Sequence, residues 1–403
     1  MALDVVKTLS ELVSIPSVNP MGRPVSGPEF YEHRVTDYLQ GVFERLKLPW
    51  QRQTVHPAQD GLPARENIFC RVEGSRPPAA GGGMLLFEAH QDTVPVDGMT
   101  IPPWTPTVRE GRIYGRGSCD IKGGMAAMLG AISRLADERP ANRPTIVLAC
   151  TINEEHGFTG ATALARMWDA GRDTILPRRP DAAVVAEPTG LQVVTAHKGC
   201  VRWKARTHGR ACHSSQPHLG DNAAYKMARV LIALEAYARD EVSRVPPHRL
   251  CGPATLSVGT IGGGLSVNTV PDLCTIEIDR RLLPGEDDLA AFEQVRQFVA
   301  KYPGVNFEVE HQHPYMRGAA LGDGPNQPLA DSLSAVVRET IGRCEQIGVP
   351  YGTDASKIAQ DGVPSVVFGP GSIDQAHTAD EWLSLAELES ASEALFRFAC
   401  RGL

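Results

Sequence analysis

The 403-residue sequence has no long uncharged hydrophobic run. Its first twenty residues, MALDVVKTLSELVSIPSVNP, place acidic side chains among apolar ones at helical spacing and lack a basic start. We therefore expect mature protein from the start of the chain, with no signal peptide and no association with a membrane. Basic runs are also lacking, and a net charge of −7 gives no reason to expect a nucleic-acid partner.

Paired cysteines are missing as well. The nine cysteines are scattered singly, with no CxxC spacing and an odd total. This usage predicts reduced, mostly buried thiols in a cytoplasmic protein rather than a disulfide framework. Cys119 stands beside Asp120 and is an alternative metal ligand, although oxygen and nitrogen donors elsewhere in the chain suffice.

Three familiar catalytic signatures do not occur. The glycines of 115–117 begin like a dinucleotide fingerprint, but Asp120 stands where the third glycine is required. The glycine pair of 369–371 is not followed by Lys-Ser or Lys-Thr, and no GxSxG elbow is present. These absences exclude a Rossmann site, a P-loop and an α/β-hydrolase nucleophile. Internal repeats are absent too.

Polar residues that can bind metals instead follow four strand-like apolar runs. In an open α/β sheet the carboxyl ends of the strands form the edge at which ligands bind. The residues are His90 and Asp92 after 84–89, Glu154 and Glu155 after 145–152, Glu187 after 182–186, and His377 beyond 366–368. The sequence therefore predicts a cluster of imidazoles and carboxylates at one sheet edge.

Two features of this cluster need a second interpretation beside the first. Asp120 follows a glycine-rich loop and opens a helical apolar pattern, so it is either a metal ligand or a helix N-cap. Glu154 and Glu155 are adjacent, and two carboxylates at one strand end repel each other unless a cation or a proton offsets the repulsion. We interpret one as a ligand and the other as a general base.

The first half of the chain alternates strands and helices. A hydrophobic content of 42% is ample for a sizeable core. Besides the runs above, we expect a strand at 67–72 and helices at 28–46, 125–136 and 159–170, after a first helix near the N-terminus. This alternation predicts an α/β fold of three layers, with a mostly parallel sheet covered by helices on both faces.

The pattern changes after about residue 195. We expect strands at 200–206, 254–261, 273–282 and 305–310, and helices at 221–240 and 287–301. This order predicts an inserted α+β domain of the ferredoxin-like type. Helices at 331–342 and 385–398 then bracket the last strand of the larger domain.

The motifs HQD, GRGSCDIKGG, NEEHG, AEPTG and QAHTADEW resemble, in order and context, those of the dinuclear zinc M20 metallopeptidase and deacylase family. The similarity covers nearly the whole chain. GRGSCDIKGG and FGPGSIDQAHTADEW are most similar to the acetylornithine deacetylase branch.

The resemblance implies a site with two zinc ions per subunit. Asp120 would bridge the ions, Glu154 would be the catalytic base, and Asp92 would orient His90. The implied ligands are His90, Asp120 and Glu187 for one ion, and Asp120, Glu155 and His377 for the other. Two imidazoles and three carboxylates also suit cobalt or manganese.

The resemblance further implies a discontinuous catalytic domain, 1–196 with 313–403, and a lid and dimerisation domain, 197–312. His213 in GRACHSSQP matches a family histidine that reaches the active site of the neighbouring subunit of a homodimer. A structural or solvent role is the alternative for a lone histidine.

Three further residues match family positions. Asn268 follows the glycines of 262–264 and is a candidate oxyanion donor. Arg281 in DRRLLPG is a candidate for binding a substrate carboxylate, with an ion pair inside the lid as the alternative. Asp354 stands in a loop, 351–355, that resembles one lining the family's site.

These residues predict a metal-dependent amidohydrolase that cleaves the amide bond of an N-acyl amino acid. A metal-bridged water would attack, Glu154 would take its proton, and His213 with Asn268 would stabilise the oxyanion. An aminopeptidase or carboxypeptidase acting on short peptides is the nearest alternative. A non-catalytic homologue is disfavoured because every ligand and the base are present.

Overall fold

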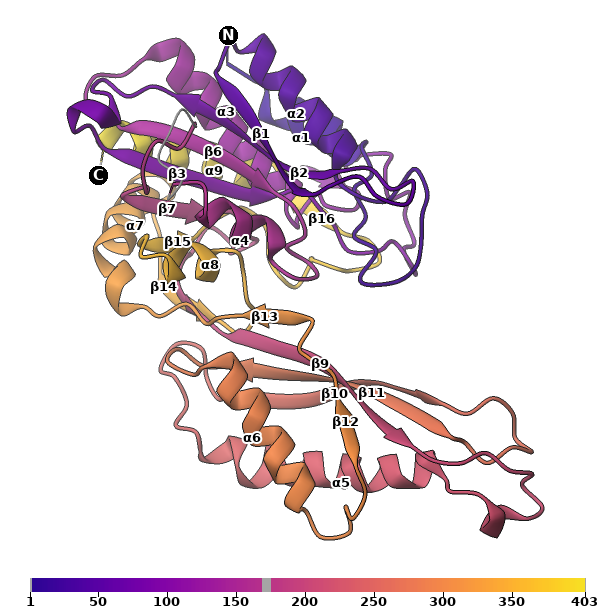
Figure 1. Ribbon diagram of the computed structural model, residues 1–403. Helices are drawn as coiled ribbons and strands as arrows, with labels where there is room; N and C mark the ends of the chain where they lie inside the picture. The colour runs from indigo at the N-terminus through magenta and orange to yellow at the C-terminus, as the bar shows by residue number, and fades with distance from the viewer. Residues whose placement is uncertain (1, 169–174, 403) are drawn as a thin grey trace. The chain divides into compact units, whose positions relative to one another are not determined.

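The computed structural model describes residues 2–168 and 175–402, and it divides the chain into two compact units (Figure 1). The first unit combines Met1–Thr195 with Asp323–Gly348 and Thr353–Leu403. The second unit is Ala196–Gly322 with Val349–Gly352, and it contains the segment 197–312 that the sequence marks as inserted.

The main sheet of the first unit has eight strands among the described residues, in the order β1-β2-β6-β3-β7-β15-β8-β14. Their bounds are β1 Trp50–His56, β2 Arg65–Val72, β3 Met84–His90, β6 Thr145–Thr151, β7 Ala182–Val185, β8 Val193–His197, β14 Gln346–Val349 and β15 Ser365–Val367. The central pairs β6-β3, β3-β7 and β7-β15 are parallel, while β1-β2, β2-β6 and β15-β8 are antiparallel. The mostly parallel sheet is thereby confirmed at its centre.

The burial of strands β3 and β6 explains why the central strands could be predicted from the sequence. Every residue of both strands is buried, as expected for strands covered on both faces, and their sequences are nearly continuous apolar runs. β1 was not predicted, because its polar residues are mostly half-buried at the edge of the sheet.

Helices cover both faces of this sheet, as the sequence predicts. Residues of α1, α2, α3, α7 and α9 share one core with the strands, and α4 and α8 lie on the other face (Figure 1). The bounds are α1 Val5–Val13, α2 His33–Arg45, α3 Lys122–Glu138, α4 Thr159–Ala165, α7 Gln327–Ile341, α8 Ala355–Gln360 and α9 Leu385–Arg401. Gly130 permits the close packing of α1 and α9 against α3, since a Cβ there would lie 2.4 Å from Val5 and 2.5 Å from Ser392.

Several expected boundaries differ from the structure. α2 begins at His33 instead of residue 28, because the Pro/Gly-rich loop extends further than its composition suggested. α4 ends at Ala165, so the helix expected at 159–170 is wrong over residues 166–168, which form a turn, and residues 169 and 170 lie outside the described residues. The strand expected at 305–310 is wrong in extent, since β12 covers only Val309–His311.

A small sheet, β16-β5-β4, joins distant parts of the first unit. β4 is Thr107–Arg109, β5 is Arg112–Tyr114 and β16 is Trp382–Ser384. Trp382 pairs with Tyr114. The loop that follows β5 therefore begins beside the point where the loop that precedes β16 ends.

The second unit has the β-α-β-β-α-β order that the sequence predicts. Its elements are β9 Gly199–His208, α5 Ala223–Asp240, β10 Thr255–Gly263, β11 Leu273–Leu282, α6 Asp288–Lys301 and β12, with β13 Met316–Gly318 paired to β9. The antiparallel sheet has the order β10-β11-β9-β12, and α5 and α6 form a core with it. Buried and half-buried residues alternate along β11, as expected for a sheet with one covered face.

The longest helix described, α5, has 18 residues and carries charged side chains along its length. Across residues 2–168 and 175–402, no helix combines the length and apolarity that crossing a membrane requires. All nine cysteines lie in these ranges and are free thiols, seven of them buried, which confirms the expectation of mostly buried thiols.

Candidate metal centre

The carboxyl edge of the four parallel strands brings together most of the residues predicted to bind metal. His90 is the last residue of β3, and Glu154 follows β6 by a short turn. Glu187 is the second residue after β7, and His377 lies in the loop between β15 and β16. Because these strands are neighbours and run in the same direction, their side chains converge at one place.

Asp120 lies between the two histidines. Its Oδ1 is 3.2 Å from Nε2 of His90, and its Oδ2 is 3.3 Å from Nε2 of His377. The same His377 nitrogen is 3.5 Å from Oε1 of Glu155. Asp120 is buried, whereas the His377 side chain is half exposed. One carboxylate between two imidazoles is the arrangement that a bridging ligand requires.

Among the described residues, two groups of donor atoms lie close enough together to hold metal ions. In each group the ligand atoms lie within 4.8 Å of one another. Glu155 is half-buried, and the other residues of the two groups are buried. The groups are His90 with Glu154 and Glu187, and His90 with Asp120 and Glu155. Both groups contain His90. The resemblance implies His90, Asp120 and Glu187 for one ion, whereas the first group has Glu154 in place of Asp120.

Crowded carboxylates dominate the electrostatics of this cluster. Burial raises the pKa of Glu154 well above its ordinary value, and the negative charge of Glu187 raises it further. Burial and the charge of Asp120 do the same to the pKa of Glu187. Burial lowers the pKa of His377, but hydrogen bonds to Asp120 and Glu155 outweigh it and raise that pKa to about 11. The cluster is therefore short of positive charge.

Divalent cations fit this donor set. Oε1 of Glu155 is buried and lies 3.5 Å from Nε2 of His377, with no other hydrogen-bond partner among the described residues, so it has a lone pair available. Imidazole nitrogens and carboxylate oxygens are the usual ligands of zinc, and cobalt and manganese accept them too. A cation also offsets the repulsion among the carboxylates.

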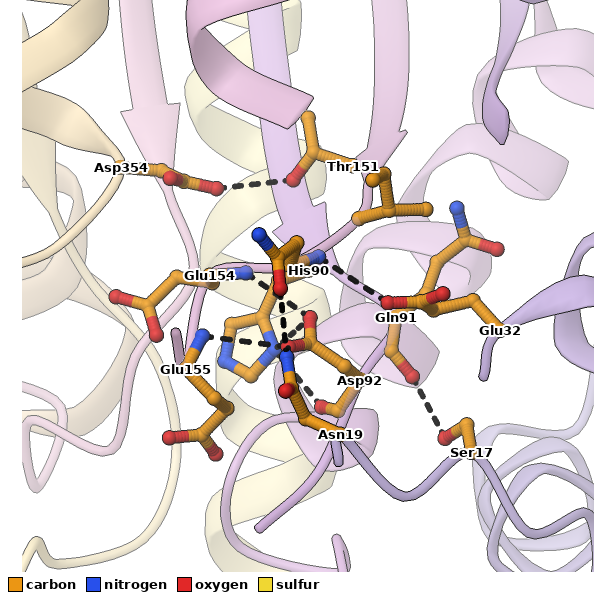
Figure 2. Close-up of polar contacts among 12 residues, drawn as sticks. Ser17, Asn19, Glu32, His90, Gln91, Asp92, Thr151, Glu154, Glu155 and Asp354 are labelled. Carbon is orange, nitrogen blue, oxygen red and sulfur yellow. Dashed lines mark hydrogen bonds and ion pairs between the residues drawn. The ribbon is translucent and has the colours of Figure 1, made fainter. Parts of the chain in front are cut away.

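The Asp92 carboxylate binds the backbone of Glu154 and Glu155 more closely than it binds the ring of His90. Nδ1 of His90 lies 2.9 Å from the main-chain oxygen of Asp92 and 3.5 Å from its carboxylate. That carboxylate accepts hydrogen bonds from the N–H groups of Glu154 and Glu155, at 3.1 and 3.2 Å, and from the side chain of Asn19 at 2.7 Å (Figure 2). Asp92 therefore holds the backbone of both glutamates.

The two alternative readings of the Asp120 loop are not borne out. α3 begins at Lys122 with Ile121 at its N-cap, so Asp120 is not a helix cap. Cys119 belongs to neither donor group of the described residues, and its Sγ donates to the main-chain oxygen of Ser372. Burial raises the pKa of the Cys119 thiol well above its ordinary value, which keeps it protonated.

Comparison with known proteins identifies the family of this chain. The model of the peptidase family M20/M25/M40 matches residues 86–401, which include all the ligand-bearing loops. The chain belongs to this family. It is therefore a metal-dependent hydrolase of amide bonds.

The chain is similar in sequence to deacetylases and in fold to solved peptidase structures. The acetylornithine deacetylase of Proteus mirabilis (strain HI4320) is 35% identical over 329 residues, which are 78% of this chain and 79% of that one. An M20 metallo-carboxypeptidase from Sulfolobus solfataricus has the same fold, with a TM-score of 0.75, 18% identity and coverage of 99% of both chains. A dinuclear metal-binding M20 peptidase from Bacillus subtilis has a TM-score of 0.64, 16% identity and coverage of 98% and 97%.

Three predicted site residues of this M20 chain lie in the second unit. His213 pairs with Thr269 in a β-bridge, and Ser214 donates to the main-chain oxygen of Asn268, so His213 and Asn268 lie side by side. The His213 ring is 2.7 Å from Oγ of Ser215 and is exposed. Arg281 makes an ion pair with Asp279 at 3.0 Å, which is the alternative considered for it.

Asp354 and Glu88 are two buried carboxyl groups that both contact Thr151, the last residue of β6, and the sequence did not reveal this pair. Oγ1 of Thr151 is 2.9 Å from Oδ2 of Asp354 (Figure 2). The same oxygen is 2.6 Å from Oε1 of Glu88. Burial raises the pKa of Asp354 to about 6 and that of Glu88 well above its ordinary value. A glutamate inside the apolar run of β3 was the one available signal.

Proposed function

We propose that the chain removes the acyl group from an N-acyl amino acid, using two zinc ions held by residues of the first unit. The observation that carries this proposal is the 35% identity to a deacetylase over 78% of the chain. The ligands we assign are His90, Asp120, Glu155, Glu187 and His377, with cobalt or manganese as possible substitutes.

The two cations would polarise the scissile carbonyl and acidify water. Glu154 is 8% exposed and lies beside His90 and Glu187, so we assign it the role of general base, which takes a proton from water and delivers it to the leaving amine. Glu155 lies near His377 and Asp120, which favours it as a ligand. Asp92 holds the backbone of both glutamates by accepting hydrogen bonds from their N–H groups.

We further propose that the second unit is a lid and dimerisation domain in a cytoplasmic homodimer. β10 is the edge strand of its sheet, and a groove of about 450 Å³ lies between α5 and β10. Ile232 and Tyr225 on α5 are exposed apolar side chains, and Ile261 on β10 is exposed too. An open edge beside apolar side chains favours pairing with a second copy. Free cysteines suit a reducing compartment.

A substrate panel tests the reaction. With zinc or cobalt added, we expect acetyl-, succinyl- and formyl-amino acids to be hydrolysed with higher kcat/KM than dipeptides, because the deacetylase relative is far more similar in sequence than the carboxypeptidase. Release of the free amine is measured for each compound. Faster turnover of dipeptides would favour the peptidase function instead, and turnover of neither class would contradict both.

A mixing experiment tests the shared site. If His213 acts on the active site of the neighbouring subunit, His213→Ala and Glu154→Ala are each nearly inactive, but a mixed dimer has one site with both residues intact. Co-refolding equal amounts should recover roughly a quarter of wild-type activity, since about half of the dimers are mixed and each has one good site of two.

Subunit exchange must be verified in the same samples, for example with differently tagged chains. Two batches of Glu154→Ala refolded together are the matched control. Absence of recovery after verified exchange would show that His213 acts within its own chain.

A further inference from the structure

Arg116 and Glu381 form a buried ion pair that belongs to none of the roles described above. Nη1 of Arg116 lies 2.6 Å from Oε2 of Glu381. Arg116 is 3% exposed and Glu381 is fully buried. We call these two side chains the loop clasp, because of the segments that they join.

Glu381 binds the backbone that carries Asp120. Its Oε1 accepts hydrogen bonds from the N–H groups of Cys119 and Asp120, at 2.8 and 3.0 Å. Its Oε2 accepts another from the N–H of Gly117, at 3.0 Å. With Arg116 included, one carboxylate collects four donors from a single loop, and one of the donors is the amide of the expected bridging ligand.

Arg116 extends the same connection to two other loops. Its Nη2 donates to the main-chain oxygen of Pro95, at 3.2 Å, and to that of Thr378, at 3.4 Å. Pro95 stands three residues after Asp92, and Thr378 directly follows His377. The clasp therefore reaches the loop after His90, the loop of Asp120 and the loop of His377.

We infer that Arg116 and Glu381 are positioning residues that fix Asp120 relative to His90 and His377 and so set the metal affinity of the centre. This inference rests on the proposed function, since it takes these residues as ligands. Burying a guanidinium and a carboxylate is costly unless their bonds are satisfied. Among the described residues only Nε of Arg116 is left without a partner in this pair, and the bonds that the two side chains make lie within or between ligand-bearing loops. Outer partners of ligands commonly change metal affinity by about 10–100-fold.

The alternative is that the clasp only stabilises the fold. Two variants separate the roles. Glu381→Gln removes the negative charge and turns an N–H donor toward the loop. Arg116→Lys keeps the ion pair, but its single ammonium replaces the planar guanidinium that joined three loops. The control is Glu393→Gln, which removes an Arg–Glu pair between α3 and α9 through Arg134, away from the ligand loops.

Three measurements are made on each full-length protein: zinc affinity by competition with a chromophoric chelator, melting temperature, and hydrogen exchange of the metal-free peptide 115–121. We expect Glu381→Gln to weaken zinc binding about 10–100-fold and to speed exchange at Cys119 and Asp120. Arg116→Lys should weaken zinc binding with little change in melting temperature, and Glu393→Gln should leave zinc affinity unchanged.

Zinc affinity within about twofold of wild type in both clasp variants would overturn the inference. An equal loss in Glu393→Gln would overturn it too, because the effect would then follow stability alone. Arg116→Lys keeps both charges paired and decides the matter if Glu381→Gln does not fold. In either case two zinc ions in the wild type would leave the proposed function standing, whereas a wild type that binds no metal would contradict the proposed function itself.

Discussion

Replacing Glu154 by glutamine is expected to lower kcat by about 10²–10⁴-fold while the protein keeps its metal. The amide has nearly the same shape, but it cannot accept the proton of the attacking water. The loop should stay in place, because Asp92 holds the Glu154 backbone and not its side chain. Steady-state kinetics and metal analysis of the same samples measure the two effects separately.

Glu155→Gln is the matched variant, since the adjacent residue has the same chemistry and the same contact with Asp92. Its side chain lies 3.5 Å from His377, so its loss should weaken metal binding, and added zinc should restore part of the activity. Loss of bound metal from Glu154→Gln, with metal retained in Glu155→Gln, would reverse the two assignments.

Removing the metal should abolish turnover, and adding zinc or cobalt should restore it. The cluster holds more carboxylates than its two histidines can neutralise, and burial with mutual repulsion raises the pKa values of Glu154 and Glu187. Cations would offset this repulsion and acidify the attacking water, so both effects should be lost when the cations are removed. We expect metal-free protein to retain less than about 1% of the activity and two equivalents of metal to restore it.

The control uses the same chelator presaturated with calcium, which separates metal removal from any direct effect of the chelator. The melting temperature should fall in metal-free protein, because a ligand that binds only the folded state stabilises it. Full activity in rigorously metal-free protein would contradict the metal-dependent mechanism.

The sequence by itself determined where the site's main side chains stand. Strands buried on both faces need nearly continuous apolar runs, so β3, β6 and β7 are visible as such, and His90, Glu154 and Glu187 are the polar residues at their ends. The ligand motifs resemble those of one family, and the family match confirms that resemblance. Polar strands such as β1 give no comparable signal, because an edge strand need not be apolar.

Only the tertiary structure decided which groups meet. Asp92 binds the backbone of Glu154 and Glu155, 62 and 63 residues away, and Glu381 binds that of Asp120, 261 residues away. Neither contact has a sequence signature, since a carboxylate that accepts from main-chain N–H groups places no demand on the identity of its partner. A local pattern fixes a strand and the edge where it ends, whereas the order of strands in the sheet and the fit of buried hydrogen bonds fix which loops touch.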